Sequence, residues 1–488
     1  MNARELIQIL PDIISIKGYI DVPIESIDYN SKKIKNGAIF VAIPGFNYDG
    51  HDFIFEALER GASAVIGEKD LDLGEKLYIR VKDSRKALAL SSAWFYEYPA
   101  DKLKLIGVTG TSGKTTVTYL ISEMLKDIGI CTGIIGTIGN VLNDRKIPTS
   151  HTTPESLELN QLFSKMVEEN IKYLAMEVSS HSLKLHRVEG IKFDVGVFTN
   201  LTQDHLDFHK TFEDYFNSKK KLFSQSKQAV INIDDESGKR LLNIINIPRW
   251  TYGLDKKADL RAENIRITAN GVSYDLVFRD KTYPVFYSTP GLFNVYNSLA
   301  AITAGVALGF PIDGLINALK KAKGVPGRFE LVENNQGIIV IVDYAHKPDG
   351  LKNVLLTIRE FCTGKVITVF GCGGDRDKGK RPIMGKISSE LSDYTIITSD
   401  NPRSEKPEAI IEQIESGIIG DNYEKITDRS EAIKKAISIA KKGDAVLIAG
   451  KGHETYQIFG DKTIHFDDRE VVREYFSKRG YLNEGTNY

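Results

Sequence analysis

The chain has 488 residues, of which 42% are hydrophobic and 26% are charged. This length corresponds to about three domains of ordinary size, and the composition is typical of a soluble globular protein. A formal net charge of −1 provides no bulk attraction for nucleic acid or for an anionic membrane, so neither is expected as a partner.

Cysteine content and hydropathy exclude further classes. The three cysteines, Cys131, Cys362 and Cys372, are widely spaced and include no C-x-x-C pair. A disulfide framework or a zinc site is therefore not expected, and a reducing compartment fits. No apolar run approaches the roughly 18 residues of a membrane span, and the N-terminus does not resemble a signal peptide. We expect a cytoplasmic protein.

Residues 105–117 carry the clearest chemical signal in the chain. The apolar residues 105–108 predict a buried strand, a glycine loop follows, and a helical pattern runs from Lys114 to about Gly129. Because loop N–H groups and a helix N-terminus attract phosphate oxygens, this order predicts a nucleoside triphosphate site. The residues expected to hold the triphosphate are Gly110, Thr111, Ser112, Gly113, Lys114, Thr115 and Thr116.

Two side chains of this loop have expected roles. Lys114 would reach the outer phosphates, and the Thr115 hydroxyl would ligate Mg²⁺. The loop is shorter than the standard motif, which has a glycine where this chain has Val108. A glycine-rich turn without a ligand is the alternative, but a lysine followed by two threonines at a helix start favours the nucleotide site.

Polar side chains follow two further predicted strands. Residues 173–177 end in Glu177, and residues 193–200 end in Asn200, which precedes a segment containing His205 and His209. Functional carboxylates in open α/β sheets lie at the C-terminal ends of strands, so Glu177 is a candidate Mg²⁺ ligand. The alternative for Glu177 is an ordinary solvated carboxylate, which is common after a strand. His205 could supply an imidazole to a second cation.

Two helical segments carry polar residues with open interpretations. Lys219 falls four residues after Tyr215 in the predicted helix 214–223, near its buried side. A lysine triplet is otherwise typical of a solvated face. Asn294 and Asn297 share one face of a later helix, where they could bracket an adenine or cap the helix. The Pro- and Gly-containing residues 324–330 predict a linker, from which Arg328 could reach phosphate.

Four successive predicted strands after residue 331 end in charged or glycine-rich loops. The strands are residues 338–342, 366–370, 394–398 and 445–449, and the loops are residues 343–348, 371–381, 399–403 and 450–454. Such a row is typical of the ligand-binding edge of a doubly wound sheet. Alternating strands and helices in residues 1–100 predict a small α/β domain.

These motifs together resemble those of the Mur ligases, the ATP-dependent amide-forming enzymes of peptidoglycan precursor synthesis. The matching segments are 109–116, 152–154, 177–181, 200–209, 294 with 297, 327–328, 343–346, 400–403 and 450–454. The resemblance implies an α/β protein with three domains. These are an N-terminal UDP-MurNAc-peptide-binding domain (1–100), a central P-loop-type ATPase domain (101–330) and a C-terminal Rossmann-like, doubly wound, amino-acid-binding domain (331–488).

The motif Asp400-Asn-Pro-Arg403 is similar to that of the members that add meso-2,6-diaminopimelate, rather than lysine, to UDP-MurNAc-L-Ala-D-Glu. Diaminopimelate has a second α-amino acid centre, whose carboxylate the planar guanidinium of Arg403 can bind bidentately. Lysine would leave that guanidinium unpaired. Glu454 is the natural partner for the distal ammonium. The implied reaction proceeds through an acyl phosphate.

The resemblance also implies site residues. Mg²⁺ would be held by Thr115, Glu177, His205 and Lys219. Lys219 matches a lysine that is carbamylated in the family (N6-carboxylysine). The catalytic residues would be Lys114, Glu177, His205 and Lys219. Further ATP-binding residues are Asn294, Asn297, Arg328, Asp343 and His346. The UDP-substrate would contact residues 45–51 together with Ser31, Thr152, Thr153, Ser179 and Arg187. Diaminopimelate would contact Arg376, Asp400, Asn401, Pro402, Arg403, Gly450 and Glu454. A monomer is expected.

Two positions depart from the family pattern, and several alternatives remain. His151 stands where some relatives have Asn, and Lys32 stands where Arg is common.

The nearest alternative function is that of the lysine-adding sister enzyme. A folylpolyglutamate synthetase would share the phosphate loop but neither the N-terminal domain nor the Asp-Asn-Pro-Arg motif. A non-catalytic nucleotide-binding regulator would have lost Lys114, Glu177, His205 or Lys219.

Overall fold

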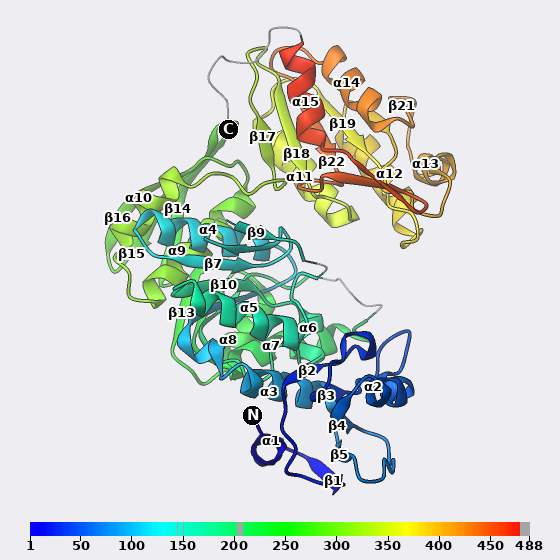
Figure 1. The fold of residues 1–488 in the computed structure, drawn as a ribbon. Coiled ribbons are helices and arrows are strands. Elements are labelled where there is room, and N and C mark those ends of the chain that lie inside the picture. The colour runs from blue at the N-terminus through cyan, green and yellow to red at the C-terminus, as the bar shows by residue number, and fades with distance from the viewer. Residues whose placement is uncertain (144, 150, 203–207, 479–488) are drawn as a thin grey trace. The chain divides into compact units, whose positions relative to one another are not determined.

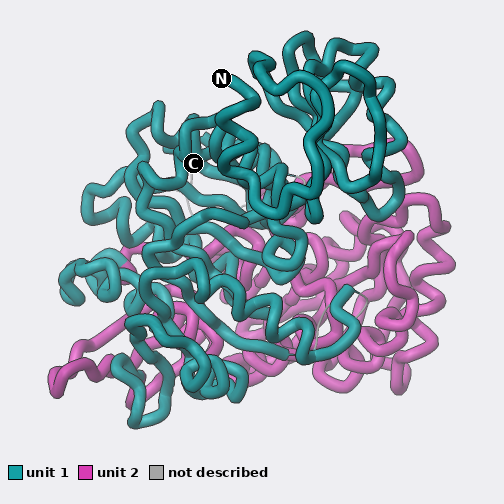
Figure 2. Tube along the Cα trace, turned by 90° about the horizontal axis from the view of Figure 1, so that it is seen from below, with its two compact units in different colours: residues 1–261, 299–318 teal, residues 262–298, 319–488 magenta. Residues whose placement is uncertain are grey.

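The computed structural model describes residues 1–143, 145–149, 151–202 and 208–478 (Figure 1). Helices and strands alternate along them, which confirms the expected α/β class. The chain separates into two compact units, residues 1–261 with 299–318 and residues 262–298 with 319–488 (Figure 2). The three-domain boundaries remain a prediction. Within the described part of the chain, no helix combines the length and apolar character that a membrane span requires.

The first sheet lies within residues 1–100 and has the order β1-β5-β4-β3-β2. Strands β2 to β5 are parallel, and β1 is antiparallel to β5. Ile39, Ile66 and Ile79 pack with Leu88 and Trp94 in its core. The elements are α1 (Ala3–Ile9), β1 (Ile13–Lys17), β2 (Ser26–Asp28), β3 (Ala38–Val41), α2 (Ile54–Glu59), β4 (Ala62–Gly67), β5 (Leu77–Val81) and α3 (Ser84–Phe95).

The second sheet contains the phosphate loop. Strands β13, β12, β11, β6, β10 and β7 are parallel neighbours in that order, and the short antiparallel strands β8 and β9 follow β7. The strands are β6 (Lys104–Thr109), β7 (Thr132–Ile135), β8 (Asn140–Leu142), β9 (Arg145–Ile147), β10 (Tyr173–Glu177), β11 (Phe193–Phe198), β12 (Ser226–Asn232) and β13 (Arg249–Gly253). The helices are α4 (Lys114–Asp127), α5 (Ser156–Glu168), α6 (Ser180–Lys184), α7 (Phe212–Ser224) and α8 (Glu236–Ile244).

The segment that follows adds strands and two helices. β14 (Leu260–Thr268) pairs with β13 through Leu260 and Arg261, and β15 (Gly271–Phe278) and β16 (Lys281–Tyr287) form an antiparallel hairpin. The helices are α9 (Leu292–Ala307) and α10 (Ile312–Lys321). α9 carries Asn294 and Asn297, as the sequence predicted.

The third sheet has the order β17-β18-β22-β19-β20-β21, and all of its strands except β17 are parallel. The strands are β17 (Glu330–Val332), β18 (Ile339–Asp343), β19 (Val366–Phe370), β20 (Tyr394–Ile397), β21 (Tyr423–Lys425) and β22 (Ala445–Ala449). The helices are α11 (Pro348–Phe361), α12 (Lys380–Leu391), α13 (Pro407–Glu415), α14 (Arg429–Ile439) and α15 (Asp468–Ser477), and β23 (Tyr456–Phe459) and β24 (Lys462–His465) form a hairpin.

Helices cover both faces of this sheet. Leu447 packs with residues of α11, α12 and α13, whereas Val446, the next residue of β22, packs with residues of α14 and α15. Because neighbouring residues of a strand point to opposite faces, a strand buried on both sides is apolar throughout. This confirms the doubly wound sheet that the four apolar runs predicted.

Candidate active site

The phosphate loop has the predicted strand–loop–helix form. β6 ends at Thr109, and α4 begins at Lys114. Gly110 and Gly113 have φ angles of +152° and +85°, and a side chain at Gly110 would collide with Thr199. Only glycine fits both demands. The Ser112 N–H donates to Oδ1 of Asn200 at 3.0 Å, which fixes the loop to the segment after β11.

Two lysine ammonium groups converge on one carbonyl of this loop. Nζ of Lys114 donates to the carbonyl oxygens of Gly110 (3.0 Å) and Thr111 (2.9 Å). Nζ of Lys219 donates to the same Gly110 oxygen at 2.7 Å, and its side chain is buried. This confirms that Lys219 lies on the buried side of α7. The paired positive charges and the N-terminus of α4 suit an anionic ligand.

Glu177 is buried at the end of β10, directly beside the phosphate loop. Its Oε1 accepts hydrogen bonds from the Thr115 hydroxyl (3.0 Å) and from the Thr137 N–H (2.7 Å). A side chain at Gly136 would collide with the same oxygen, so the chain leaves room for the carboxylate there. The contact follows from the sheet order, because β10 and β6 are parallel neighbours whose C-terminal ends meet.

Hydroxyl and carboxylate oxygens are ligands that Mg²⁺ prefers, so Thr115 and Glu177 fit the ion. His205, the third expected ligand, lies outside the described residues. Among the described residues, no group of three or more His, Cys, Asp or Glu side chains could hold a metal ion. The fit to Mg²⁺ thus rests on the Thr115–Glu177 pair.

Four residues expected at the UDP-substrate lie together near Glu177. The Thr153 hydroxyl donates to the Glu177 carbonyl oxygen (2.9 Å) and to Oγ of Ser179 (3.3 Å). Nη1 of Arg187 donates to the Thr153 carbonyl oxygen at 3.0 Å. The Thr152 and Thr137 hydroxyls lie 3.1 Å apart.

Ser31 is placed differently from those four residues. It opens a short 3₁₀ helix that follows β2, and its hydroxyl donates to Glu56 at 3.0 Å. In the 45–51 loop, Nδ1 of His51 lies 2.6 Å from the Asp49 carboxylate and its Nε2 accepts the Glu68 N–H. His151, which stands where some relatives have Asn, lies near Arg187, and burial is the main cause that lowers its pKa.

Asp343 ends β18 and fixes the segment around Arg328. Its carboxylate accepts the N–H groups of Phe329 (2.6 Å) and Ala345 (2.7 Å), and burial raises its pKa. The Arg328 guanidinium lies 4.8 Å from the centre of the Tyr344 ring.

His346, the other residue of this segment expected to bind ATP, lies beyond Tyr344. Its Nδ1 lies 2.8 Å from the Tyr344 carbonyl oxygen, and burial is the main cause that lowers its pKa to about 4. The imidazole is therefore neutral around pH 7.

The two asparagines of α9 contact each other. Nδ2 of Asn297 donates to Oδ1 of Asn294 at 3.2 Å, and Nδ2 of Asn294 donates to the Pro290 carbonyl oxygen at 2.8 Å. Both side chains are buried. The Pro290 contact shows that Asn294 holds the segment before the helix, while the adenine contact remains a prediction.

The residues expected to bind the amino acid meet at the C-terminal ends of β19, β20 and β22. Nη1 of Arg403 donates to the Gly374 carbonyl oxygen at 2.8 Å, and Nδ2 of Asn401 donates to Oε2 of Glu454 at 3.0 Å. A Cβ atom at Gly450, which has a φ of +118°, would lie 2.7 Å from the Asp400 carboxylate.

Two further residues of this predicted set lie beside the Gly373–Gly374 turn. The Pro402 carbonyl oxygen lies so close to Gly374 that a side chain there would collide with it, and Arg376 is exposed on the same loop. The order β18-β22-β19-β20 places strands that are far apart in the chain side by side. These loops therefore meet only because the sheet has formed.

The sequence analysis missed two buried arginines behind these loops. Arg381 binds both carboxylate oxygens of Glu405 at 2.9 Å, which lowers the pKa of Glu405 to about 2. Arg429 binds both carboxylate oxygens of Asp468 (2.7 and 2.8 Å) and also the Ala449 carbonyl oxygen. Arg381 ends the charged loop 371–381 and Arg429 follows Asp428, so both stand among other charges and no local pattern marks them as buried.

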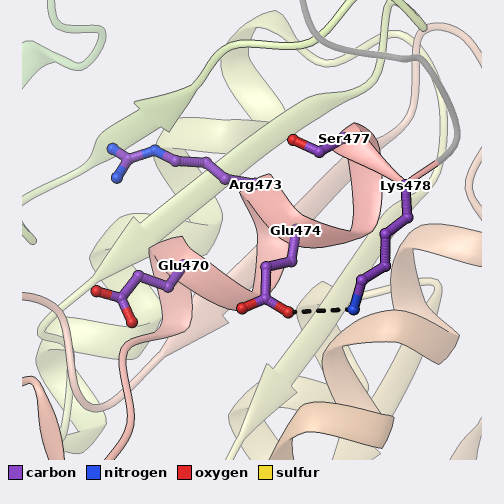
Figure 3. Close-up of a pocket in the computed structure, with 5 residues that line it drawn as sticks. All are labelled: Glu470, Arg473, Glu474, Ser477 and Lys478. Carbon is purple, nitrogen blue, oxygen red and sulfur yellow. Dashed lines mark hydrogen bonds and ion pairs between the residues drawn. The ribbon is translucent and has the colours of Figure 1, made fainter. Parts of the chain in front are cut away.

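A pocket on α15 is lined by Glu470, Arg473, Glu474, Ser477 and Lys478 (Figure 3). Nζ of Lys478 lies 3.4 Å from the Glu474 carboxylate, one helical turn away. None of these residues belongs to the predicted site, and the pocket is a charged surface feature.

Comparison with known proteins gives matches along most of the chain. The family models described as "Mur ligase family, catalytic domain", "Mur ligase middle domain" and "Mur ligase, glutamate ligase domain" match residues 23–96, 108–305 and 327–452. The UDP-N-acetylmuramoyl-L-alanyl-D-glutamate--2,6-diaminopimelate ligase 1 of Clostridium acetobutylicum is 52% identical over 95% of this chain and 97% of its own length. The corresponding ligase of Clostridioides difficile is 50% identical over 98% of this chain and its full length.

The solved structures give the same result. A UDP-N-acetylmuramoyl-L-alanyl-D-glutamate--2,6-diaminopimelate ligase superposes with a TM-score of 0.73 and 32% identity over 99% of this chain and 100% of its own. The MurF ligase of Thermotoga maritima, solved with ADP, has a TM-score of 0.61 and 22% identity over 94% of this chain and 97% of its own, which shows a shared fold. The chain therefore belongs to the Mur ligase family of ATP-dependent ligases.

Proposed function

We propose that this protein joins meso-2,6-diaminopimelate to UDP-MurNAc-L-Ala-D-Glu, with ATP converted to ADP and phosphate. The observation that carries the proposal is that Asn401 contacts both Glu454 and Arg403 where the strands of the third sheet end. A guanidinium, an amide and a carboxylate match the carboxylate and ammonium of the distal centre of diaminopimelate. The names of the relatives that match nearly the whole chain support the same substrate.

In the proposed mechanism, the γ-carboxylate of the D-Glu residue attacks the γ-phosphate of ATP, and ADP leaves. The amine of diaminopimelate then attacks the acyl phosphate and displaces phosphate, which gives the amide. Carboxylate and triphosphate repel each other, so positive charge must offset both. Lys114 and the N-terminus of α4 supply such charge at the phosphate loop.

Mg²⁺ would be held by Thr115 and Glu177, and it would neutralise the charge of the triphosphate. A carbamate on Lys219 would turn a buried cation into an anion able to hold a second ion, and this modification remains a prediction, as does the role of His205. Asn294, Asn297, Arg328, Asp343 and His346 are the further proposed ATP residues. Thr152, Thr153, Ser179, Arg187 and Ser31 are those proposed for the UDP-substrate. A monomer without a nucleic-acid partner also remains a prediction.

The test is an assay of the pure protein with ATP, Mg²⁺, UDP-MurNAc-L-Ala-D-Glu and either meso-diaminopimelate or L-lysine. We expect phosphate release and a tripeptide product, identified by its mass, with diaminopimelate. Turnover with lysine alone would refute the assigned specificity, and turnover with neither amino acid would refute the function.

A further inference from the structure

Lys451 is a fully buried lysine inside the proposed amino-acid site. It lies two residues after the end of β22, and its side chain has no exposed surface. Its Nζ lies 3.2 Å from Oδ1 of Asn401 and 3.2 Å from Oε2 of Glu454. Because burying an ammonium is costly unless it is paired, these two contacts stabilise the side chain there.

The amide of Asn401 has a fixed orientation in this cluster. Its Oδ1 accepts the Lys451 ammonium and the Ile458 N–H (3.1 Å), so the amide nitrogen must face the other way. That nitrogen donates to Oε2 of Glu454 at 3.0 Å. Lys451 thus acts on Glu454 twice, directly and through the asparagine, and both hydrogen bonds reach the same carboxylate oxygen.

The Lys451 ammonium offsets the effects of burial and of a neighbouring carboxyl group on the pKa of Glu454. Burial raises the pKa of Glu454, the nearby Asp400 raises it further, and the Lys451 ammonium opposes both effects. Among the described residues, the charged and titratable groups that act on Glu454 include Lys451, Asp400, Arg429, Tyr344 and Tyr456. Burial raises the pKa of both tyrosines, so they stay neutral around pH 7, and the charge of Arg429 is bound by Asp468.

We propose that Lys451 is a positioning residue for the amino-acid substrate, which holds Oε2 of Glu454, directly and through Asn401, so that Oε1 can receive the distal ammonium. Because Lys451 and Asn401 both bond to Oε2 of Glu454, Oε1 is the oxygen that would receive the substrate ammonium. This inference rests on the proposed function and deepens it, since it concerns recognition of the same diaminopimelate.

The experiment compares the wild type with Lys451→Met and Lys451→Arg. Turnover of the wild type with diaminopimelate tests the proposed function by itself. In Lys451→Met we expect the KM for diaminopimelate to rise about tenfold or more, with the KM for ATP unchanged, since a hydrogen-bonded charge is lost only at the amino-acid site.

The pH profile separates positioning from mere packing. Without the ammonium, the pKa of Glu454 rises, so the acidic limb of kcat/KM for diaminopimelate should move to higher pH in Lys451→Met. Lys451→Arg keeps the charge and should return the limb toward the wild type. Lys462→Met, a matched change at an exposed position of β24, should leave both KM values and the limb unchanged. An unmoved limb, or equal increases in both KM values, would overturn the inference.

A double variant covers the case in which Lys451→Met fails to fold. The double variant Lys451→Met/Glu454→Gln leaves no unpaired carboxylate at position 454, and it is compared with Glu454→Gln alone. If Lys451 acts through Glu454, the two variants have the same KM for diaminopimelate. A further loss in the double variant would show an independent role and would contradict the proposal.

Discussion

The hydroxyl of Thr115 donates a hydrogen bond of 3.0 Å to Oε1 of Glu177, although 62 residues separate the two in the chain. The contact joins the first turn of α4 to the end of β10. Among the residues that the structure describes, this pair marks where the proposed Mg²⁺ would lie, and the assignment can be tested directly.

Replacing Glu177 with Gln should weaken the response of the enzyme to Mg²⁺. The amide keeps the volume but carries no charge, and its NH₂ group cannot bind a cation. We expect kcat to fall about 100-fold or more, with a higher Mg²⁺ concentration needed for half-maximal rate. Phosphate release titrated with Mg²⁺ measures both. Glu236→Gln, at an exposed position of α8, is the control, and an unchanged Mg²⁺ titration in Glu177→Gln would refute the assignment.

Replacing Lys114 with Met should impair ATP use more than folding. Its ammonium donates to the loop carbonyl oxygens of Gly110 and Thr111, and charge at this place is expected to stabilise the phosphates. We expect kcat/KM for ATP to fall about 100-fold or more, with little change in the melting temperature. Lys126→Met in the last turn of the same helix should behave as the wild type. Full ATP turnover by Lys114→Met would exclude a phosphate site at this loop.

Replacing Arg403 with Ala should damage amino-acid use selectively. We expect the KM for diaminopimelate to rise about 100-fold and the KM for ATP to stay within about twofold, because a charged bidentate contact is lost at one substrate only. Arg403→Lys should recover little, since an ammonium cannot form the paired contact. Initial rates at saturating concentrations of the other substrates provide the two constants. Equal increases in both would contradict the role of Arg403.

Breaking the buried pair of Arg429 and Asp468 should destabilise the protein strongly. Both side chains are fully buried, so Asp468→Asn leaves a guanidinium without its counter-charge. We expect the free energy of unfolding to fall by about 3–5 kcal/mol in urea denaturation. The exposed pair of Glu474 and Lys478 lies on the same helix, and Glu474→Gln should cost less than about 0.5 kcal/mol. Similar losses in both variants would show that burial does not govern the effect.

His346 should make stability depend on pH. Its pKa in the folded protein is about 4, below the value of 6.5 for an unperturbed histidine, so the unfolded chain binds more protons between these values. The stabilisation is therefore fully present above pH 6.5 and is lost as the pH falls toward 4, by at most about 3 kcal/mol. In His346→Gln, the free energy of unfolding should decrease less from pH 7 to pH 5 than in the wild type.

The exposed His465 is a control of opposite sign. Its hydrogen bond with Glu470 raises the pKa of His465, so any stabilisation by this contact is lost as the pH rises. His465→Gln should therefore not reduce the loss of stability on acidification. Identical pH profiles for the wild type and His346→Gln would show that His346 is not a buried neutral group.

Much of the fold could be predicted because its signals are local. The apolar runs at residues 366–370 and 445–449 coincide with β19 and β22, since strands buried on both faces carry continuous hydrophobic sequence. The glycines of the phosphate loop mark the turn from β6 into α4, because the backbone there needs positive φ angles. The loops at the ends of these strands were thereby identified as candidate sites.

The sequence by itself thus determined the elements, the strand ends that carry polar residues and, through its motifs, the family. Only the tertiary structure decided which of those residues touch. Lys451 and Asn401 are 50 residues apart and Arg429 and Asp468 are 39 apart, yet each pair is in direct contact. Their contacts depend on the order in which β18, β22, β19 and β20 lie side by side. Hydrophobic periodicity reports which face of an element is buried, but it does not specify which element will cover that face.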